Sequence, residues 1–350
     1  MSRPASCLLI FVLASFGVQG TYAQERQAAN REIYLYQGAD RAQRLLSGAR
    51  KEGGLSLYTT MTPEDAGPLV AAFEEKYGVK VRMWRGINQK LVQRALAEAR
   101  AGKSAVDVFE GSGHGMEILH REALLEKFWS PAFGDIPQEA FPSHGHYAPD
   151  NLLFFVMGYN TRLVKPEDVP RSYEDLLRPG WSGNFGIEAS DIIWFAAVAK
   201  AMGEEKGLAY FRKLAEMKPQ IRNGHTLMTE LVAAGEIPVV LTLYNQAVDK
   251  LKERGAPIDW KPLPPAFGRA DGIGVAKQAP HPHAALLFAD FVLSPEGQRF
   301  IMAASRVPVN RKVGSSFDQR NFRIIELAPV VDEWDSWERR WQALFLKGQK

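Results

Sequence analysis

Tyr244 ends a run of aliphatic residues and is the first residue whose chemistry suggests a ligand site. It lies in GEIPVVLTLYNQAVDKL, residues 235 to 251, and Asn245 follows it directly. The run 237–243 predicts a buried strand and the residues after it predict a helix, so Tyr244 is expected at a strand end, where open α/β sheets bind ligands. Its phenol can donate to an oxyanion or, once deprotonated, ligate a hard metal ion. A tyrosine that only packs is the alternative.

Polar and glycine residues follow the other predicted strands as well. Several of them lead into predicted helix N-termini, whose free N–H groups and positive dipole ends suit an anion. Helix capping is the first role expected for Asp191, with ligand contact second. The candidate ligand-binding residues are Thr59, Thr60, Arg85, Ser112, Gly113, His114, Ser190, Asp191, Asn223, Thr226, Tyr244 and Asn245.

Two histidine pairs invite a metal interpretation. His144 and His146 flank a glycine, and His281 and His283 flank a proline at a predicted helix start. No cysteine or third histidine stands near them in the sequence, so structural or solvated roles are expected for both pairs.

Enzyme chemistry has little support in the sequence. The one close serine and histidine pair is Ser112 and His114, two residues apart in a glycine-rich turn with no evident orienting acid. Neither a G-x-S-x-G elbow nor an H-E-x-x-H motif occurs. We therefore expect a binding protein with no catalytic residues and no cofactor.

Composition places the chain among ordinary globular proteins. It has 350 residues, 46% hydrophobic and 24% charged, which is enough for two lobes of typical domain size. Positive and negative charges nearly balance, and basic residues form no run interleaved with aromatics. Nucleic acid is therefore an unexpected partner.

The N-terminus predicts export. Residues 1–23 contain one positive charge at Arg3, an apolar run from Cys7 to Val18 and a small-residue exit, as secretory signal peptides do. Cleavage is expected after Ala23, which places the mature chain in the periplasm. Because Cys7 is the only cysteine and is removed with the signal, the mature chain would contain no disulfide and would depend on a large core.

Short apolar runs alternate with amphipathic stretches along the rest of the chain. Thr62 as cap and Pro63 at the first helical position mark one clear helix start. This alternation predicts parallel sheets with helical connections, and therefore an α/β fold. Strands are expected at 55–59, 79–83, 105–109, 151–158, 184–188, 237–243 and 271–276. The segments 145–161 and 260–277 are expected to cross between two lobes.

Four stretches together resemble the periplasmic solute-binding proteins of ABC importers, in their ferric-ion-binding branch. They are LSLYTTMTPEDAGPLVAAFEEKYGVKV, SAVDVFEGSG, LVAAGEIPVVLTLYNQAVDKLKERGAPIDW and APHPHAALLFADFVLSPEGQRF, and the resemblance covers roughly residues 40 to 312. It implies a two-lobe α/β fold with each lobe a mostly parallel sheet flanked by helices. It also implies a ligand cleft between the lobes, closure about a hinge, and delivery to a membrane permease with its ATPase.

The organisation expected from this resemblance has four parts. Lobe 1 is 24–147 plus 268–310, and lobe 2 is 148–267. A C-terminal helical segment, 311–350, is expected to dock on the body through an apolar stripe of Trp334, Trp337, Trp341, Leu344 and Phe345. The protein is expected to be a monomer.

The sequence departs from the resemblance at the metal ligands. Ferric-ion binders of this group carry two adjacent tyrosines after the strand that follows GEI, whereas here Tyr244 is followed by Asn245 and Gln246. Because Fe³⁺ prefers several anionic oxygens, Tyr244 alone supplies too few ligands for a ferric-ion site. The expected ligand is an organic anion, or iron or another metal bound with a synergistic anion. A sensor input that binds ligand, and less so a hydrolase, remain alternatives.

Overall fold

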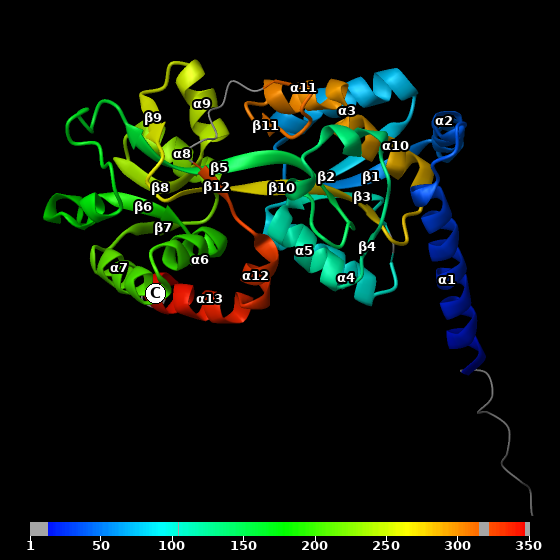
Figure 1. Cartoon of the computed structure of the whole chain (residues 1–350), viewed down its shortest axis with the longest axis horizontal. Coiled ribbons are helices and arrows are strands. Elements are labelled where there is room, and N and C mark those ends of the chain that lie inside the picture. Colours follow the sequence, from blue (N-terminus) through cyan, green and yellow to red (C-terminus); the bar gives the residue numbers. More distant parts are fainter. Residues whose placement is uncertain (1–12, 104, 315–321, 347–350) are drawn as a thin grey trace, which may run out of the picture.

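The structure is a computed structural model that describes residues 13–103, 105–314 and 322–346. Its strands form one continuous sheet in the order β2-β1-β3-β10-β5-β8-β6-β7, with helices on both faces of the sheet (Figure 1). The two long strands at the centre, β5 (Ala148–Asn160) and β10 (Ala266–Ala276), run from one half of the molecule to the other. The two crossings that the sequence predicts are these strands.

Lobe 1 is the half of the sheet beyond β10. Its strands are β1 (Gly54–Thr59), β2 (Lys80–Arg85), β3 (Val108–Ser112), β4 (Leu125–Glu126) and β11 (Val307–Pro308). Its helices are α1 (Leu13–Leu35), α2 (Arg41–Glu52), α3 (Pro63–Tyr77), α4 (Asn88–Arg100), α5 (Gly113–Arg121), α10 (Pro282–Leu293) and α11 (Pro295–Ala303), with 3₁₀ turns at Pro131–Asp135 and Gln138–Ala140.

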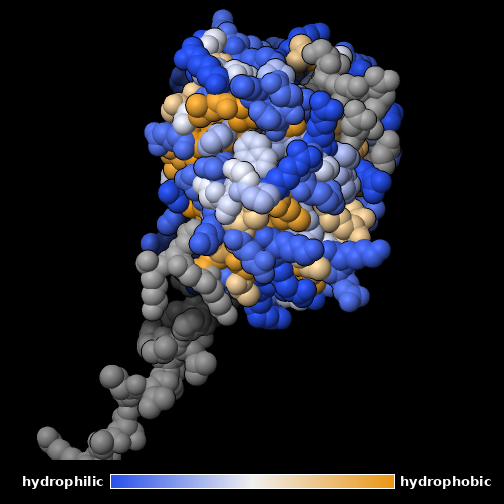
Figure 2. Space-filling model, turned by 90° about the vertical axis from the view of Figure 1, so that its left-hand side faces the viewer, coloured by the Kyte–Doolittle hydropathy of each residue, from blue (hydrophilic) through white to orange (hydrophobic). Residues whose placement is uncertain are grey.

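Lobe 2 is the half beyond β5. Its strands are β6 (Phe185–Glu188), β7 (Gln220–Arg222), β8 (Val239–Tyr244) and β9 (Ile258–Lys261). Its helices are α6 (Ile192–Ala201), α7 (Glu204–Glu216), α8 (His225–Ala234) and α9 (Asn245–Glu253), with 3₁₀ turns at Glu174–Leu177 and Pro179–Trp181. The face that this lobe presents in Figure 2 is mainly hydrophilic, with hydrophobic residues in separate groups.

Strand direction differs between the outer and the crossing strands. β1 pairs in parallel with β2 and β3, and β6 pairs in parallel with β7 and β8. β5 and β10 are antiparallel to each other and to their outer neighbours, β8 and β3. The outer strands of each lobe are therefore parallel as predicted, and the chain reverses where it passes between the lobes.

The predicted elements match the structure closely. The seven expected strands correspond to β1, β2, β3, β5, β6, β8 and β10, although several end two or three residues later than expected. The Thr62 side chain accepts a hydrogen bond from the Asp65 N–H at 3.2 Å, and Pro63 begins α3, so this predicted cap is confirmed. The shorter strands β4, β7, β9, β11 and β12 (Phe322–Ile324) were not predicted, because two to four residues give too little periodicity.

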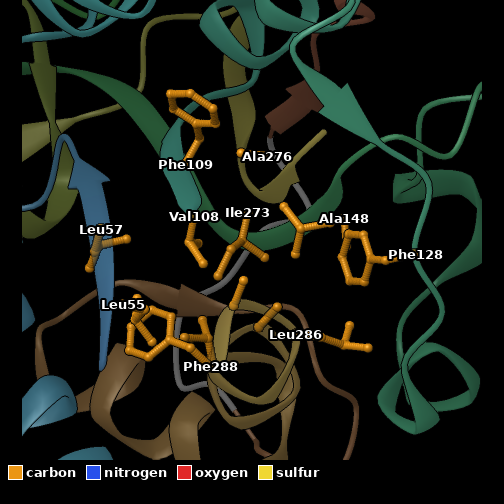
Figure 3. Close-up of a cluster of buried hydrophobic side chains, with 14 of the residues drawn as sticks. Leu55, Leu57, Val108, Phe109, Phe128, Ala148, Ile273, Ala276, Leu286 and Phe288 are labelled. Carbon is orange, nitrogen blue, oxygen red and sulfur yellow. The ribbon is translucent and has the colours of Figure 1, made fainter. Parts of the chain in front are cut away.

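The two largest clusters of buried hydrophobic residues lie one in each lobe. In lobe 1, Leu55, Val108 and Ile273 from the sheet pack against Leu286 and Phe288 of α10 (Figure 3). The lobe 2 core draws its buried residues from 155–267 and from the C-terminal segment. The exact lobe boundaries given above stay a prediction.

The N-terminal prediction falls partly outside the described residues. Residues 1–12, including Cys7, are among those not described. α1 runs through the expected cleavage point, and its last two turns hold Tyr34, whose hydroxyl donates to the Ala276 carbonyl at 3.0 Å. Of the helices described, none combines the length and apolarity needed to cross a membrane.

The C-terminal segment joins both lobes. β12 (Phe322–Ile324) pairs in parallel with β10, and α12 (Leu327–Asp332) then packs against α5 and α6. α13 (Trp334–Trp341) and the short π-helix Gln342–Leu346 follow. Trp337 and Trp341 are fully buried in the lobe 2 core, as their helical spacing predicts.

Replacing Trp341 with alanine should destabilise the protein strongly. Trp341 packs against Phe195 and Phe345, and its indole N–H donates to the Ala189 carbonyl at 2.7 Å. Trp341→Ala should lower the free energy of unfolding by about 3–5 kcal/mol, measured by urea denaturation. Leu163→Ala is the control, since Leu163 is 54% exposed and its loss should cost under about 0.5 kcal/mol. Equal losses in the two variants would contradict the docking of this segment.

Candidate functional site

Tyr244 is the last residue of β8 and stands immediately before α9. Its ring stacks on the imidazole of His225, with centroids 4.0 Å apart and planes 21° from parallel. Its hydroxyl accepts a hydrogen bond from Nε of Arg269, on the crossing strand β10, at 3.2 Å. Burial raises the pKa of the phenol above its ordinary value, against the opposing charge of Arg269. Tyr244 is therefore held by polar neighbours at the predicted strand end.

His225 connects Tyr244 to two carboxylates of lobe 2. Its Nε2 lies 3.1 Å from each carboxylate oxygen of Asp191, and Glu188 ends the neighbouring strand β6. One potential ligand atom each from Glu188, Asp191 and His225 lies within 4.8 Å of the others. Carboxylate oxygens and imidazole are common ligands of transition metals. This corner of lobe 2 therefore has the groups, together with Tyr244, for a metal ion.

Both carboxylates already have partners within lobe 2. Glu188 accepts from the Gly224 N–H at 2.8 Å, and from the N–H and hydroxyl of Ser190 at 2.6 and 2.7 Å. Asp191 stands at the N-cap position of α6, but its side chain makes no capping bond and faces His225 instead. The expectation that Asp191 first caps the helix is therefore wrong, because the nearby imidazole is the stronger, charged partner.

Ser112, Gly113 and His114 form the start of α5 in lobe 1. Ser112 caps the helix by accepting from the Gly115 N–H, and Nδ1 of His114 lies 3.2 Å from the Ser112 hydroxyl. The His114 ring stacks on Trp334 of α13, with centroids 4.7 Å apart. Burial, assisted by the charge of Arg269, lowers the pKa of His114 to about 3. His114 is therefore a neutral group at physiological pH.

Thr59 and Thr60 serve a buried carboxylate of lobe 1. The Thr59 hydroxyl and the Thr60 N–H, at 3.1 Å for the latter, both donate to the same oxygen of Glu110. The other oxygen, Oε1, is buried without a hydrogen-bond partner among the described residues. Burial raises the pKa of Glu110, and Arg306 opposes that rise. These threonines thus hold Glu110 in place beside the strand ends.

Of the remaining predicted residues, one is buried and four are exposed. Asn245 is buried, and its side-chain oxygen accepts from the Phe154 N–H at 3.2 Å, which fixes the crossing strand β5. The side chains of Arg85, Asn223, Thr226 and Ser190 are exposed. Arg85 lies on the edge strand β2, and Asn223 and Thr226 flank the loop and helix start that carry His225.

A chain of buried charges links the lobes along β10. Arg269 pairs with Asp271 two residues further along the same strand face. Arg306 lies 3.7 Å from Asp271 and 3.3 Å from Asp65 of α3. Asp65 also pairs with Lys250 of α9, so an ion pair joins a lobe 1 helix to a lobe 2 helix. The exposed pair of Glu64 and Arg254 joins the same two helices.

Sequence reasoning did not select Glu188, His225, Arg269, Asp271, Arg306 or Trp334 for this site. The alternation R-A-D within the apolar crossing 260–277 was the available signal, because two charges two residues apart share one face of a strand. A pair of opposite charges on a strand buried on both faces indicates a functional or hinge position.

The second histidine pair has the structural role expected for it. His281 contacts Asp107 through its backbone N–H at 2.7 Å and its Nδ1 at 3.0 Å. His283 is the second residue of α10, which begins at Pro282, and its Nδ1 lies 2.7 Å from a carboxylate oxygen of Glu52. The first pair, His144 and His146, has a different environment that is described below.

The pH dependence of stability should distinguish the two site histidines. Burial alone would lower the pKa of His225, but the charges of Asp191 and Glu188 outweigh it, so the pKa is raised. The stabilisation from charged His225 is therefore complete below about pH 6.5 and is lost as pH rises through the raised pKa. In urea denaturation, His225→Gln should lower the free energy of unfolding relative to wild type, and this loss should be largest near pH 6 and shrink towards pH 9.

His114→Gln provides the control of opposite sign. Because the folded pKa of His114 is lowered, its contribution is present above about pH 6.5 and is lost as pH falls. The loss in free energy of unfolding caused by His114→Gln should grow from pH 5 to pH 7 and then stay constant. A His225→Gln deficit that does not change with pH would contradict the charged pair with Asp191.

The sequence and the fold of this protein resemble those of known proteins. Residues 68–318 match the sequence model of the family described as bacterial extracellular solute-binding protein. The chain is 26% identical over 308 residues to iron uptake protein A1 of Synechocystis, covering 79% of this chain and 84% of that protein.

Two solved structures share the fold. Iron-bound HitA from Pseudomonas aeruginosa is 22% identical with a TM-score of 0.74, covering 83% of this chain and 99% of that one. AfuA from Actinobacillus pleuropneumoniae, with exogenous fructose-6-phosphate bound, is 22% identical with a TM-score of 0.75, covering 84% and 99%. AfuA is named a periplasmic binding protein, and both likenesses show the same two-lobe fold. The family match covers most of the chain, and we conclude that this protein belongs to the bacterial extracellular solute-binding proteins.

Proposed function

We propose that this protein is the periplasmic solute-binding component of an ABC importer. It captures a small ligand between Tyr244, His225 and Asp191 of lobe 2 and the start of α5 in lobe 1, and closes about β5 and β10. It then delivers the ligand to a permease and ATPase complex in the inner membrane. The observation that carries this proposal is the cluster of polar groups where the strand ends of both lobes meet, together with the family match.

The ligand that this site fits best is a metal ion bound with an accompanying anion, with iron as the leading metal. Glu188, Asp191, His225 and Tyr244 offer three oxygen donors and one nitrogen from one corner of lobe 2. This set is richer in anionic oxygen than the lone tyrosine seen in the sequence. The names of relatives support iron: one is an iron uptake protein and another, from Serratia marcescens and 23% identical, is a Fe(3+)-binding periplasmic protein.

The accompanying anion would lie against lobe 1 and Arg269. The bonds described for Arg269 use its Nε and Nη1, which contact Tyr244 and Asp271. Ser112 is the cross-strand neighbour of Asp271, the partner of Arg269, and Gly113 at the start of α5 lies against the Ala270 carbonyl of β10. An oxyanion there would complete the metal coordination from the lobe 1 side.

An organic anion without a metal is the second candidate. The raised pKa of Tyr244 keeps its phenol neutral and suited to donate a hydrogen bond, while N–H and hydroxyl donors occupy Glu188 and the His225 ring occupies Asp191. The likeness to AfuA, whose structure holds fructose-6-phosphate, favours a phosphorylated sugar within this class. A sensor that binds the same ligand but passes it to a receptor has no separate support.

Ser112 and His114 carry no hydrolase proposal, although they lie within hydrogen-bond distance. The Ser112 oxygen is the cap of α5 and accepts from the Gly115 N–H. The other neighbours of His114 are the Asn88 amide, at 3.4 Å from its Nδ1, and the Trp334 ring, neither of which is an acid that would orient a catalytic imidazole.

The mature chain begins, in this proposal, after cleavage at Ala23. Lobe 1 then comprises 24–147 plus 268–310, lobe 2 comprises 148–267, and 311–350 forms the C-terminal segment of a monomer. The predicted ligand-binding set, Thr59, Thr60, Arg85, Ser112, Gly113, His114, Ser190, Asp191, Asn223, Thr226, Tyr244 and Asn245, is extended by Glu188, His225 and Arg269.

The ligand class is tested by what the purified protein carries. Native mass spectrometry of protein from its native host, combined with elemental analysis, should find one metal ion and a small anion per chain. A reddish protein with a tyrosinate-to-iron absorption band would identify iron ligated by Tyr244. A bound organic phosphate without metal would favour the second candidate, and a protein that binds neither metal nor anion would contradict the proposal.

Replacing Tyr244 with phenylalanine should weaken ligand binding. The substitution removes the hydroxyl that contacts Arg269 but keeps the ring that stacks on His225. Tyr244→Phe should cost about 1–3 kcal/mol of binding free energy, roughly 5- to 150-fold in Kd, because the ligand would lose a polar partner in a buried site. Calorimetric titration with the co-purifying ligand measures this.

Tyr159→Phe is the matched control, because Tyr159 lies on β5 at the far end of lobe 2, where its phenol faces Asp259. Thr226→Ala tests an exposed residue beside His225. Wild-type affinity in Tyr244→Phe, with an unchanged melting temperature, would show that Tyr244 only packs.

A further inference from the structure

Three histidines gather on lobe 1, away from the ligand-binding residues described above. His120 is in the last turn of α5, and His144 and His146 lie in the loop that leads into the crossing strand β5. The rings of His120 and His144 stack with centroids 3.6 Å apart, and those of His120 and His146 are 4.3 Å apart. One nitrogen of each histidine lies within 4.8 Å of the others, and all three side chains are partly exposed.

The hydrogen bonds of this cluster leave ring nitrogens available. Nδ1 of His146 contacts the carbonyl of His144 at 3.1 Å, so it carries the proton and Nε2 keeps its lone pair. Nδ1 of His120 is buried without a hydrogen-bond partner among the described residues. A buried, unpaired ring nitrogen is costly in a folded protein and calls for an explanation.

His144 has the arrangement of an oriented metal ligand. Its Nε2 donates to a carboxylate oxygen of Glu117 at 3.1 Å, and its Nδ1 accepts the backbone N–H of His146, also at 3.1 Å, a bond that a metal ion at Nδ1 would replace. Histidines that bind metals commonly donate their second nitrogen to a carboxylate, which fixes the tautomer and the ring. Glu117 is itself held by Arg121, one turn further along α5.

The surrounding charges do not exclude a cation. The charged groups that act on these rings are Glu117 and Arg121 of α5, and Glu126 and Lys127 at β4. Neutral imidazole is the form that ligates a metal ion, and two acidic groups offset the two basic ones.

We propose that His120, His144 and His146 form a binding site for a divalent transition-metal ion of the zinc class. The three imidazoles supply three nitrogen ligands, Glu117 orients His144, and water completes a tetrahedral set. The parallel rings of His120 and His144 turn towards the ion when it binds, which their partial exposure permits. Zn²⁺, Cu²⁺ and Ni²⁺ all suit imidazole, and Zn²⁺ is the probe chosen here.

The position of this site gives it a structural consequence. It would join the end of α5, the helix whose start carries Ser112 and His114, to the residues just before β5. A bound ion would therefore hold the end of α5, the helix proposed to contact the ligand, against the start of the crossing strand β5. Because an ion that binds only the folded state stabilises it, the melting temperature should rise with Zn²⁺ concentration.

Calorimetric titration of chelator-treated protein with ZnCl₂ tests the proposal. The starting protein is His225→Ala, which removes a ligand from the other group able to hold a metal, Glu188, Asp191 and His225. We expect one Zn²⁺ per chain. Adding His146→Gln should weaken binding by at least about 100-fold, since loss of an orienting partner alone costs about 10- to 100-fold.

Two further variants make the result specific. His283→Gln is the matched control, because His283 also pairs with a carboxylate, Glu52, and is partly exposed, yet it lies far from the cluster in α10. When His283→Gln is added to the starting protein His225→Ala, the affinity for Zn²⁺ should stay that of His225→Ala alone, which is called the parent below. Glu117→Gln should weaken binding by about 10- to 100-fold while keeping the three ligands.

A thermal melt of each variant with and without Zn²⁺ provides the second readout. The Zn²⁺-dependent rise in melting temperature should be present in the parent and His283→Gln and absent in His146→Gln. Absence of Zn²⁺ binding in the parent, or unchanged affinity in a folded His146→Gln, would overturn the proposal.

Discussion

The buried pair of Arg269 and Asp271 on β10 is the interaction on which the site depends. An unpaired charge in a protein interior costs several kcal/mol, so each of these residues requires its partner. Arg269 also donates to Tyr244, which belongs to lobe 2, and Asp271 also faces Arg306, which contacts Asp65 of lobe 1. One strand therefore fixes, through charge, the positions of groups in both lobes. Any rotation of the lobes about β5 and β10 must rearrange these bonds.

The two lobes bring different chemistry to this strand. Lobe 2 supplies two carboxylates, an imidazole whose pKa they raise, and a phenol, through Glu188, Asp191, His225 and Tyr244. Lobe 1 supplies hydroxyls, helix N–H groups and a neutral imidazole at the start of α5. α12 and α13 lie across both, with Leu327 near Gly113 and Trp334 stacked on His114. The C-terminal segment thus forms part of the surroundings of the site, and it also anchors in the core of lobe 2.

Local sequence patterns predicted most of the elements and where they end. The Thr62 and Pro63 cap, the aliphatic run before Tyr244 and the two crossing segments all have a short-range signal, and each is present in the structure. His225 lies between Asn223 and Thr226, which were expected at the site, but no local pattern selects it, because it follows β7, a strand of three residues, and meets Asp191 only through folding. His120 was missed for the same reason, since it is far from His144 in the chain. Trp334 fits the helical stripe but turns towards His114, because α13 begins at the junction between the lobes.

Small-angle scattering of the purified protein, with and without its co-purifying ligand, tests the central claim that the lobes close on a ligand. Asp65 of α3 pairs with Lys250 of α9, and Glu64 of α3 pairs with Arg254, which directly follows α9, so we expect opening of the lobes to break both ion pairs. Ligand-free protein should have the larger radius of gyration, and saturating ligand should reduce it, while a sulfate control should not. An identical radius of gyration in the free and ligand-saturated protein would contradict the account.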